Sequence, residues 1–338
     1  MQDINDKLIV ALDVDTLEKA ERLVNTLYPT VRLFKVGSQL FTAHGPAAVE
    51  MIGKKGARVF LDLKFYDIPN TVYMATASGT SCAFVYVTEP RGVKNFAIPP
   101  VFMMTVHIAG GKKMLEEASR SAKEISDELR IPKPLIVGVT RLTSEEYSSK
   151  NTQDEILGSA RLAKDAGLDG VVCAVSEAKI IREEFGKNFI IVTPGIRPKG
   201  TSVDDQKRIA TAQEAIEAGA NYIVVGRPII EAEDPCKATE NILDDIKRAA
   251  ALKEIVFYIF APRAKEVYVA GDFNDWILND DSRMRRDGGR WVAKINLKPG
   301  KYHYQFFIDG GWVEDPNNPV KELDQHGKMS SLIELKGK

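Results

Sequence analysis

The sequence predicts a closed (β/α)₈ barrel of the TIM type, followed by an all-β sandwich of the immunoglobulin type. Eight short apolar runs rich in valine and isoleucine recur through the first 250 of the 338 residues, and each is followed by a stretch with helical periodicity. After residue 250 the runs become aromatic and alternate with polar residues, as in antiparallel sheets with one solvated face. We therefore expect a barrel over residues 1–250 and a sandwich over residues 251–338.

The predicted barrel strands are continuous apolar runs, a pattern typical of strands that are covered on both faces. In chain order these runs are Leu8 to Val14, Val31 to Gly37, Ala57 to Leu63, Val101 to His107, Pro134 to Thr140, Gly170 to Val175, Phe189 to Gly195 and Tyr222 to Gly226. Segments between them, such as 16–27 and 143–167, have the periodicity of amphipathic helices. A doubly wound open sheet has the same order of elements and is the structural alternative.

One unit departs from this pattern. Residues 73–100 stand where a crossover helix belongs, yet they contain two glycines and three prolines, and Cys82 to Pro90 has the β-branched and aromatic composition of a strand. We expect no clean helix over this atypical segment. It is either a long surface loop with a strand-like middle or a foreign segment in place of the native helix.

The predicted sandwich consists of short aromatic runs separated by turn residues. The runs cover residues 253–262, 265–273, 289–297, 300–310 and 330–335. Turn sequences lie between them, such as Asp287–Gly288–Gly289 and Pro299–Gly300. This pattern favours antiparallel strands joined by tight turns.

Composition excludes several function classes. Lysine and arginine total 46 against 47 aspartates and glutamates, so no global positive field attracts nucleic acid or anionic lipid. No run of about 18 apolar residues indicates a membrane span, and no early apolar stretch indicates a signal peptide. The three cysteines are far apart and without metal-ligand spacing. We expect a cytoplasmic protein that binds neither membranes nor nucleic acid and holds no metal.

The densest group of functional side chains follows the third predicted strand. Asp62 and Lys64 lie two residues apart at the end of that strand and so point the same way, while Asp67 follows in the loop and Lys35 ends the preceding strand. Such a group of charges is costly to bury unless the charges pair, and perturbed ionisable groups concentrate at functional sites. A structural salt-bridge network is the alternative interpretation.

A second group suits a phosphate. TPGIRP (Thr193 to Pro198) and VVGRPI (Val224 to Ile229) follow the last two predicted strands. Each contains a glycine that lets backbone amides approach an anion, followed by an arginine, Arg197 or Arg227, for a bidentate contact. In a (β/α)₈ barrel this is the usual position of a phosphate site.

A series of motifs then gives a specific resemblance over residues 1–72 and 101–249: ALDVD, FKVG, DLKFYDIPNT, TVHIAGG, GVTRLTS, TPGIRP with DDQKRIAT, and VVGRPI. In order and spacing they resemble the orotidine 5′-phosphate decarboxylase family, for which the pattern DxKxxDIPNT is highly specific. The resemblance implies a homodimer that converts orotidine 5′-phosphate to UMP in de novo pyrimidine biosynthesis, without cofactor or metal.

The resemblance also implies roles for individual residues. Lys64 would donate a proton to C6 of the pyrimidine, Asp62 would sit beside the substrate carboxylate, and Lys35 and the partner's Asp67 would complete the charged array. Contacts to the rest of the substrate are implied for Asp13 and Thr71 at the ribose, with Thr71 reaching across the dimer, for Thr140 at the pyrimidine edge, and for Gln206, Arg197, Gly226 and Arg227 at the phosphate. The segment DDQKR is implied as a lid over that phosphate.

The C-terminal part resembles a different family. VYVAGDFNDW and the stretch Gly289 to Pro316 are similar to the glycogen-binding module of AMP-activated kinase β subunits and to carbohydrate-binding family 48. That resemblance implies an α-glucan site in which Trp276 and Trp312 stack on glucose rings. Gln305 stands where that family often has lysine, and core packing of the two tryptophans is the alternative.

Two other functions stay open. One is an engineered chimera in which both domains serve as a scaffold that presents residues 73–100, with reduced or no enzymatic activity. The other is a glycogen- or starch-associated binding protein. UMP formation supports the enzyme, whereas retention on amylose that depends on Trp276 and Trp312 supports glucan binding.

Overall fold

The computed structural model describes residues 4–82, 85–87, 96–98, 100–140, 152–198, 210–250, 253–280, 282–297, 299–324 and 327–335. The chain divides into two compact units, residues 1–249 and 250–338. Each unit is described by itself.

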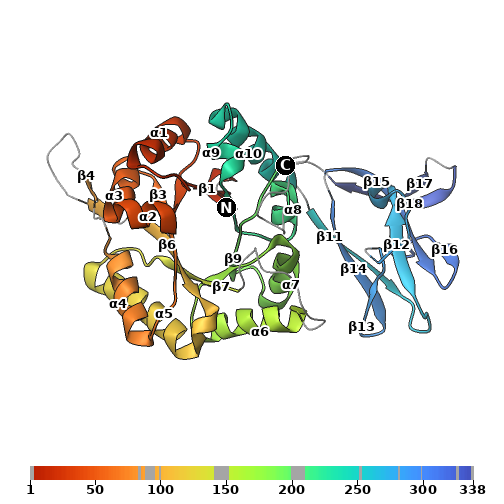
Figure 1. Ribbon diagram of the computed structural model, residues 1–338. Coiled ribbons are helices and arrows are strands. Elements are labelled where there is room, and N and C mark those ends of the chain that lie inside the picture. Colours follow the sequence, from red (N-terminus) through yellow and green to blue (C-terminus); the bar gives the residue numbers. More distant parts are fainter. Residues whose placement is uncertain are drawn as a thin grey trace. The chain divides into compact units, whose positions relative to one another are not determined.

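The first unit is a closed barrel of eight parallel strands (Figure 1). The strands are β1 (Leu8–Ala11), β2 (Leu33–Gly37), β3 (Arg58–Phe65), β6 (Val101–His107), β7 (Leu135–Val139), β8 (Gly170–Val172), β9 (Ile190–Thr193) and β10 (Tyr222–Val225). Each pairs with the next in this order, and β10 closes on β1 through Ile9 and Val224. Closure confirms the predicted (β/α)₈ barrel and excludes the doubly wound open sheet.

Helices surround the barrel, as Figure 1 shows. They are η1 (Ile4–Lys7), α1 (Leu17–Leu27), α2 (Ser38–His44), α3 (Pro46–Lys54), α4 (Pro69–Thr80), η2 (Ile108–Gly110), α5 (Gly111–Leu129), α6 (Thr152–Asp165), α7 (Val175–Phe185), α8 (Ala212–Glu217), α9 (Arg227–Ile230) and α10 (Pro235–Ala250). Helix α1 shows the local rules: the Thr16 hydroxyl accepts a hydrogen bond from the Lys19 backbone N–H at 3.2 Å, and Ala20, Val24 and Leu27 form the buried stripe. No described helix is both long enough and apolar enough to cross a bilayer.

Alternating strand residues form two separate apolar cores in the barrel. One set, including Ile9, Leu33, Phe60 and Met103, packs inside the barrel, while the intervening residues pack against the helices. Inward-facing positions recur every second residue, so the interior core continues into the residues that end each strand. This alternation positions the functional site.

Helix α4 corrects one expectation. No clean helix was expected over residues 73–100, but α4 spans Pro69–Thr80 and therefore includes residues 73–80. Pro69 occupies the first helical position, where proline is favoured. Gly79 suggests a helix breaker, yet a Cβ at that position would lie 2.4 Å from the Met104 sulfur, so this glycine permits close packing on β6. The expectation of a displaced helix is wrong for these residues.

The strand-like composition of residues 82–90 is confirmed in part. β4 (Val85–Val87) pairs antiparallel with β5 (Phe96–Ile98) in a two-stranded sheet. Residues 83–84, 88–95 and 99 lie outside the described residues. The unusual part of the unit therefore begins after α4.

The second unit is a sandwich of two antiparallel sheets, as predicted. One sheet contains β11 (Lys253–Phe260), β14 (Arg290–Leu297) and β13 (Arg285–Asp287); the other contains β12 (Val267–Gly271), β15 (Gly300–Ile308), β16 (Gly311–Val313), β17 (Lys321–Leu323) and β18 (Met329–Leu335), with η3 (Asp272–Asn274) after β12. Phe257 and Trp291 from the first sheet pack with Val269, Tyr304 and Phe306 from the second in one core.

A pair of glycine substitutions tests the packing of the barrel. A Cβ on Gly170 in β8 would lie 2.0 Å from the Ile190 carbonyl oxygen of β9, whereas a Cβ on Gly158 in α6 meets no described atom within 4 Å. We expect Gly170→Ala to lower the free energy of unfolding by about 1–3 kcal/mol. Gly158→Ala should raise it by about 0.5–1 kcal/mol, because alanine loses less backbone entropy in a helix. Urea unfolding measures both, and equal effects of the two substitutions would contradict this account.

Candidate active site

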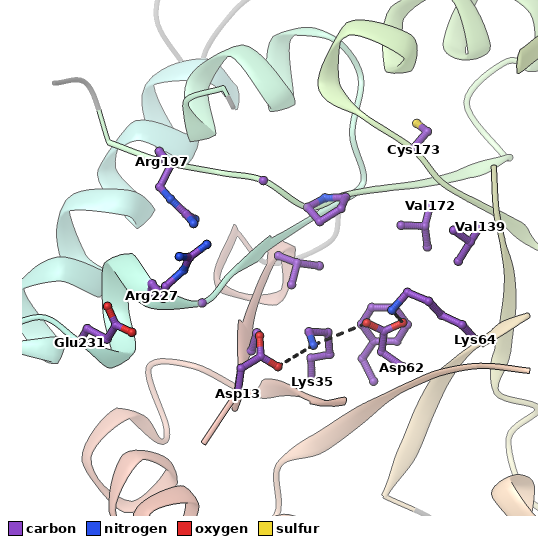
Figure 2. Close-up of a pocket in the computed structure, with 16 residues that line it drawn as sticks. Asp13, Lys35, Asp62, Lys64, Val139, Val172, Cys173, Arg197, Arg227 and Glu231 are labelled. Atoms are coloured by element: carbon purple, nitrogen blue, oxygen red, sulfur yellow. Dashed lines mark hydrogen bonds and ion pairs between the residues drawn. The ribbon is translucent and has the colours of Figure 1, made fainter. Parts of the chain in front are cut away.

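A pocket of about 490 Å³ opens at the carboxyl ends of the barrel strands. Its polar lining residues are Asp13, Lys35, Asp62, Lys64, Arg197, Arg227 and Glu231 (Figure 2). The first four of these residues lie at or near the carboxyl ends of β1, β2 and β3. The two arginines follow β9 and β10, so the two predicted groups of functional residues share one pocket.

Four charged side chains form a chain of alternating sign along one side of the pocket. The Lys35 Nζ lies 2.9 Å from the Asp13 Oδ1 and 3.5 Å from the Asp62 Oδ2, and the Lys64 Nζ lies 2.9 Å from the Asp62 Oδ1. Lys35 is 9% exposed and Asp62 is 8% exposed. Burial of these two charges is tolerable because each faces an opposite charge at contact distance.

The paired charges shift the pKa values of the buried members. Burial by itself would raise the pKa of Asp62, but the Lys35 and Lys64 ammonium groups, with hydrogen bonds from Lys64 and Thr105, outweigh it and hold that pKa below 3.8. Burial likewise lowers the pKa of Lys35, but the carboxylates of Asp62 and Asp13 outweigh it and raise that pKa above 10.5. Both groups are therefore charged at neutral pH.

The end of β3 is irregular where Asp62 and Lys64 stand. Leu61 pairs with Met104 of β6, but the next pair is Phe65 with Val106, so β3 advances four residues while β6 advances two. Lys64 has a φ of 50°, in the left-handed region that long side chains rarely adopt. Both side chains line the pocket, as predicted from their spacing. Asp62 follows the regular alternation from Phe60, whereas the bulge places Lys64.

Sequence reasoning missed Thr105, which lies on β6 beside this bulge. Its hydroxyl accepts a hydrogen bond from the Lys64 backbone N–H at 2.8 Å and donates one to the Asp62 Oδ1 at 3.0 Å. The side chain is fully buried. The available signal was a polar residue within the otherwise apolar run Val101–Val106.

The opposite end of the pocket holds the predicted phosphate residues. Arg197 is 7% exposed, and its Nη1 donates a hydrogen bond to the Ile196 carbonyl oxygen at 3.0 Å. Arg227 begins α9 directly after Gly226, which also lines the pocket. Figure 2 shows both arginines on the side of the pocket away from Lys64. Gln206 and the predicted lid lie outside the described residues.

Two further residues line the same pocket without a prediction from the sequence. Glu231 follows α9 beside the arginines, and nothing in its local sequence indicated a site residue. Cys173 follows β8 and is almost fully buried. Burial, followed by the nearby Glu177 carboxylate, raises the pKa of the Cys173 thiol well above 9.0, so this thiol is neutral at physiological pH.

Three predicted residues do not line this pocket in the described part of the chain. Asp67 and Thr71 line an adjoining depression of about 290 Å³, to which Lys64 also contributes. The Asp67 Oδ1 accepts a hydrogen bond from the Ile68 backbone N–H at 2.6 Å. The Thr140 hydroxyl lies 3.2 Å from the Val172 carbonyl oxygen and 3.4 Å from the Glu177 Oε2.

Among the described residues, no group of three or more His, Cys, Asp or Glu side chains is arranged to hold a metal ion.

The tryptophans of the sandwich lie next to each other. The rings of Trp276 and Trp312 have centroids 5.7 Å apart at an interplanar angle of 66°, and Phe307 lies 5.1 Å from Trp312. Trp312 is 41% exposed, and the Trp276 indole N–H donates to the Asp272 Oδ1 at 3.2 Å. Gln305 is buried and donates a hydrogen bond to the Met329 carbonyl oxygen at 2.7 Å.

Comparisons with known proteins divide the chain in the same place. The family model described as "Orotidine 5'-phosphate decarboxylase / HUMPS family" matches residues 6–242, and the model described as "Glycogen recognition site of AMP-activated protein kinase" matches residues 256–338.

Individual relatives match the barrel almost end to end. The orotidine 5′-phosphate decarboxylase of Coxiella burnetii (strain RSA 493 / Nine Mile phase I) is 44% identical over 254 residues, which are 73% of this chain and 99% of that protein. The enzyme of the same name from Moorella thermoacetica is 44% identical over 250 residues, 72% of this chain and 92% of that protein.

Among solved structures, the orotidine 5′-phosphate decarboxylase of Lactobacillus acidophilus is 32% identical, with a TM-score of 0.58 over 71% of this chain and 99% of that chain. Since the family model spans more than half of the residues and these relatives are matched over nearly their whole length, the chain belongs to the orotidine 5′-phosphate decarboxylase / HUMPS family.

Proposed function

We propose that the barrel decarboxylates orotidine 5′-phosphate to UMP, in de novo pyrimidine biosynthesis, within the pocket of Figure 2. One observation supports this best: a single pocket holds a buried array of lysines and aspartates at one end and two arginines at the other. The substrate has two anionic groups to match, a carboxylate on C6 of the pyrimidine and a phosphate on the ribose.

The charged array suits the chemistry of this reaction. When the bond from C6 to the carboxylate breaks, its electron pair stays on C6, where no ring carbonyl or imine can delocalise it. A preorganised ammonium group stabilises such charge and costs no reorganisation during the reaction. We assign this role to Lys64, which then gives its proton to C6. Asp62 lies beside the departing carboxylate, so their repulsion falls as CO₂ leaves.

The remaining residues hold the substrate at a distance from C6. Arg197, Gly226 and Arg227 bind the phosphate in this proposal, with Gln206, and Asp13 contacts the ribose. Phosphate binding supplies energy that orients the pyrimidine over the array. The Thr140 hydroxyl donates toward Val172 and Glu177, so its oxygen can still accept a hydrogen bond from an N–H group on the pyrimidine edge.

A homodimer would complete the site. Asp67 and Thr71 lie outside the main pocket, and exposed apolar side chains surround them: Tyr66 is 64% exposed, Ile68 66% and Met74 57%. Contiguous exposed apolar side chains are typical of subunit interfaces. In the proposed dimer, Asp67 and Thr71 of each subunit reach the pocket of the other.

A cytoplasmic location fits this metabolic role. Cys82, Cys173 and Cys236 all carry free thiols, the usual state in a reducing compartment.

The scaffold that presents residues 73–100 remains the alternative. Helix α4 forms through Thr80, and the Ser121 hydroxyl of α5 donates a hydrogen bond to the Tyr73 carbonyl oxygen at 2.7 Å. The barrel therefore keeps its crossover helix, which favours a working enzyme. A wild-type chain without turnover would favour the scaffold.

The sandwich supports a second function, binding of an α-glucan. The neighbouring rings of Trp276 and Trp312 offer flat apolar surfaces for glucose rings. The Gln305 side chain is buried and donates a hydrogen bond to the Met329 carbonyl oxygen, so it does not replace the lysine of the related family at that surface. Binding of a glucan would therefore depend on the two tryptophan rings.

Replacement of Lys64 tests the enzymatic proposal. We expect Lys64→Ala to lower kcat by at least about 10²–10⁴-fold, because the ammonium group both stabilises the carbanion and protonates it. UMP should still bind, since its phosphate contacts are unchanged. Measurements of UMP formation and of UMP affinity by calorimetry check both parts, and near-normal turnover would refute the assignment.

Mixing of two inactive variants extends this test to the dimer. An equal mixture of Lys64→Ala and Asp67→Ala chains should regain roughly one quarter of wild-type activity, because half of the random dimers contain one intact site. A mixture that stays inactive would place Asp67 in the site of its own chain. Sedimentation of the mixture verifies that dimers form.

The depressed pKa of Asp62 predicts a pH dependence of stability. A carboxyl group whose folded-state pKa is lowered contributes stability that is present above its unfolded-state pKa and is lost as the pH falls through the folded-state value. We expect Asp62→Asn to be less stable than wild type by about 1–3 kcal/mol at neutral pH. The difference should shrink as the pH falls below 3.8. Urea unfolding across this range measures it, and a difference that grows in acid would contradict the pairing.

Amylose affinity chromatography tests the sandwich. Retention of the wild-type chain should be lost in Trp276→Ala and in Trp312→Ala, because each substitution removes a flat apolar surface that a glucose ring would cover. Phe260→Ala is the matched control, since Phe260 is 70% exposed on β11 in the other sheet. Equal loss in the control, or no retention of the wild type, would argue against this site.

A further inference from the structure

The bulge in β3 creates a structural problem beside the proposed proton donor. Between the pairs Leu61–Met104 and Phe65–Val106, β3 contains two more residues than β6. Backbone groups in such a bulge lose their regular ladder partners. Lys64 lies in this stretch with a φ of 50°, a conformation that persists only where the surroundings hold it.

Thr105 lies where it can hold this conformation. It stands two residues after Met103, which packs in the barrel interior, so its side chain faces the same interior. The Thr105 Oγ1 is 2.8 Å from the Lys64 backbone nitrogen and 3.0 Å from the Asp62 Oδ1. One fully buried hydroxyl therefore contacts both charged residues of the bulge.

The polarity of these hydrogen bonds is fixed. A backbone N–H can only donate, so the Thr105 oxygen accepts from Lys64 and its single hydrogen is free for Asp62. The Asp62 Oδ1 also lies 2.9 Å from the Lys64 Nζ. Asp62, Lys64 and Thr105 thus close a ring in which the lysine is held at its backbone and at its ammonium group.

We propose that Thr105 is a positioning residue for decarboxylation, which holds the Lys64 backbone and the Asp62 carboxylate in the geometry that aims the ammonium group at C6. This inference rests on the proposed role of Lys64. Thr105 itself touches no reacting atom. Its hydroxyl sets the distance between the group that protonates C6 and the group that faces the carboxylate.

Thr105→Val tests the proposal, because it removes the hydroxyl and keeps the β-branched shape. We expect kcat to fall about 10–100-fold, as misplacement by about 1 Å does elsewhere. KM should stay within about threefold, since the phosphate contacts are distant. Thr105→Ser, which restores the hydroxyl, should recover kcat to within about threefold of wild type.

Thr76→Val is the matched control. Thr76 on α4 is also fully buried, and its hydroxyl has no hydrogen-bond partner among the described residues, so kcat should be unchanged. If Thr105→Val does not fold, Thr105→Ala and Thr105→Cys replace it with the same expected loss. Circular dichroism and UMP affinity verify that each variant is folded.

The outcomes separate this inference from the enzymatic proposal. A wild-type chain that forms no UMP overturns both. If the wild type is active, three results overturn the positioning role alone. They are a kcat of Thr105→Val within about threefold of wild type, a change in KM without a change in kcat, and an equal fall in kcat in Thr105→Val and Thr105→Ser. A selective loss of kcat that serine restores supports it, because a merely structural residue would not separate kcat from KM.

Discussion

The buried pair of Lys35 and Asp62 is the interaction on which the site depends. Each charge is less than one tenth exposed and is paired twice: the two face each other, Lys35 also contacts Asp13, and Asp62 also contacts Lys64. The parallel pairing of β2 with β3 brings them together, with Gly37 opposite Asp62. A Cβ at Gly37 would lie 2.9 Å from the Lys35 Nζ and 3.3 Å from the Asp13 Oδ1, so a side chain there would displace the ammonium group. The charge array therefore depends on the strand pairing and on the glycine beside it.

Regular elements of the barrel were predictable because burial on both faces leaves a continuous apolar run in the sequence. The irregular features were not predictable from the sequence. Gly79 resembles a helix breaker when only its own propensity is considered, and its purpose appears only beside the Met104 sulfur. The bulge after Leu61 is invisible to a period-two pattern, because a bulge is a property of the pairing between two strands. Thr105 was missed for the same reason.

The residues of the site show the same difference between what is predictable from a regular pattern and what is not. Asp13, Lys35 and Asp62 each stand two positions after an interior core residue, so alternation alone directs them into the pocket. Asp67 and Thr71 come after the strand, where local sequence does not determine which pocket they serve. Thr140 directly follows β7, and its hydroxyl donates toward the Val172 carbonyl oxygen and the buried Glu177 carboxylate. The local sequence pattern predicts which way a side chain on a strand points, whereas the hydrogen-bond partner of that side chain depends on the tertiary structure.

In the proposed reaction, negative charge moves from the substrate carboxylate to C6, a shift of about one bond length. The array of two lysines and two aspartates has no net charge to favour either location. Only its internal arrangement can do so, with Asp62 nearer the carboxylate and Lys64 nearer C6. A displacement comparable to that bond length would erase the difference. A lysine held in a left-handed conformation by a buried hydroxyl is therefore consistent with a site whose selectivity depends on position rather than on total charge.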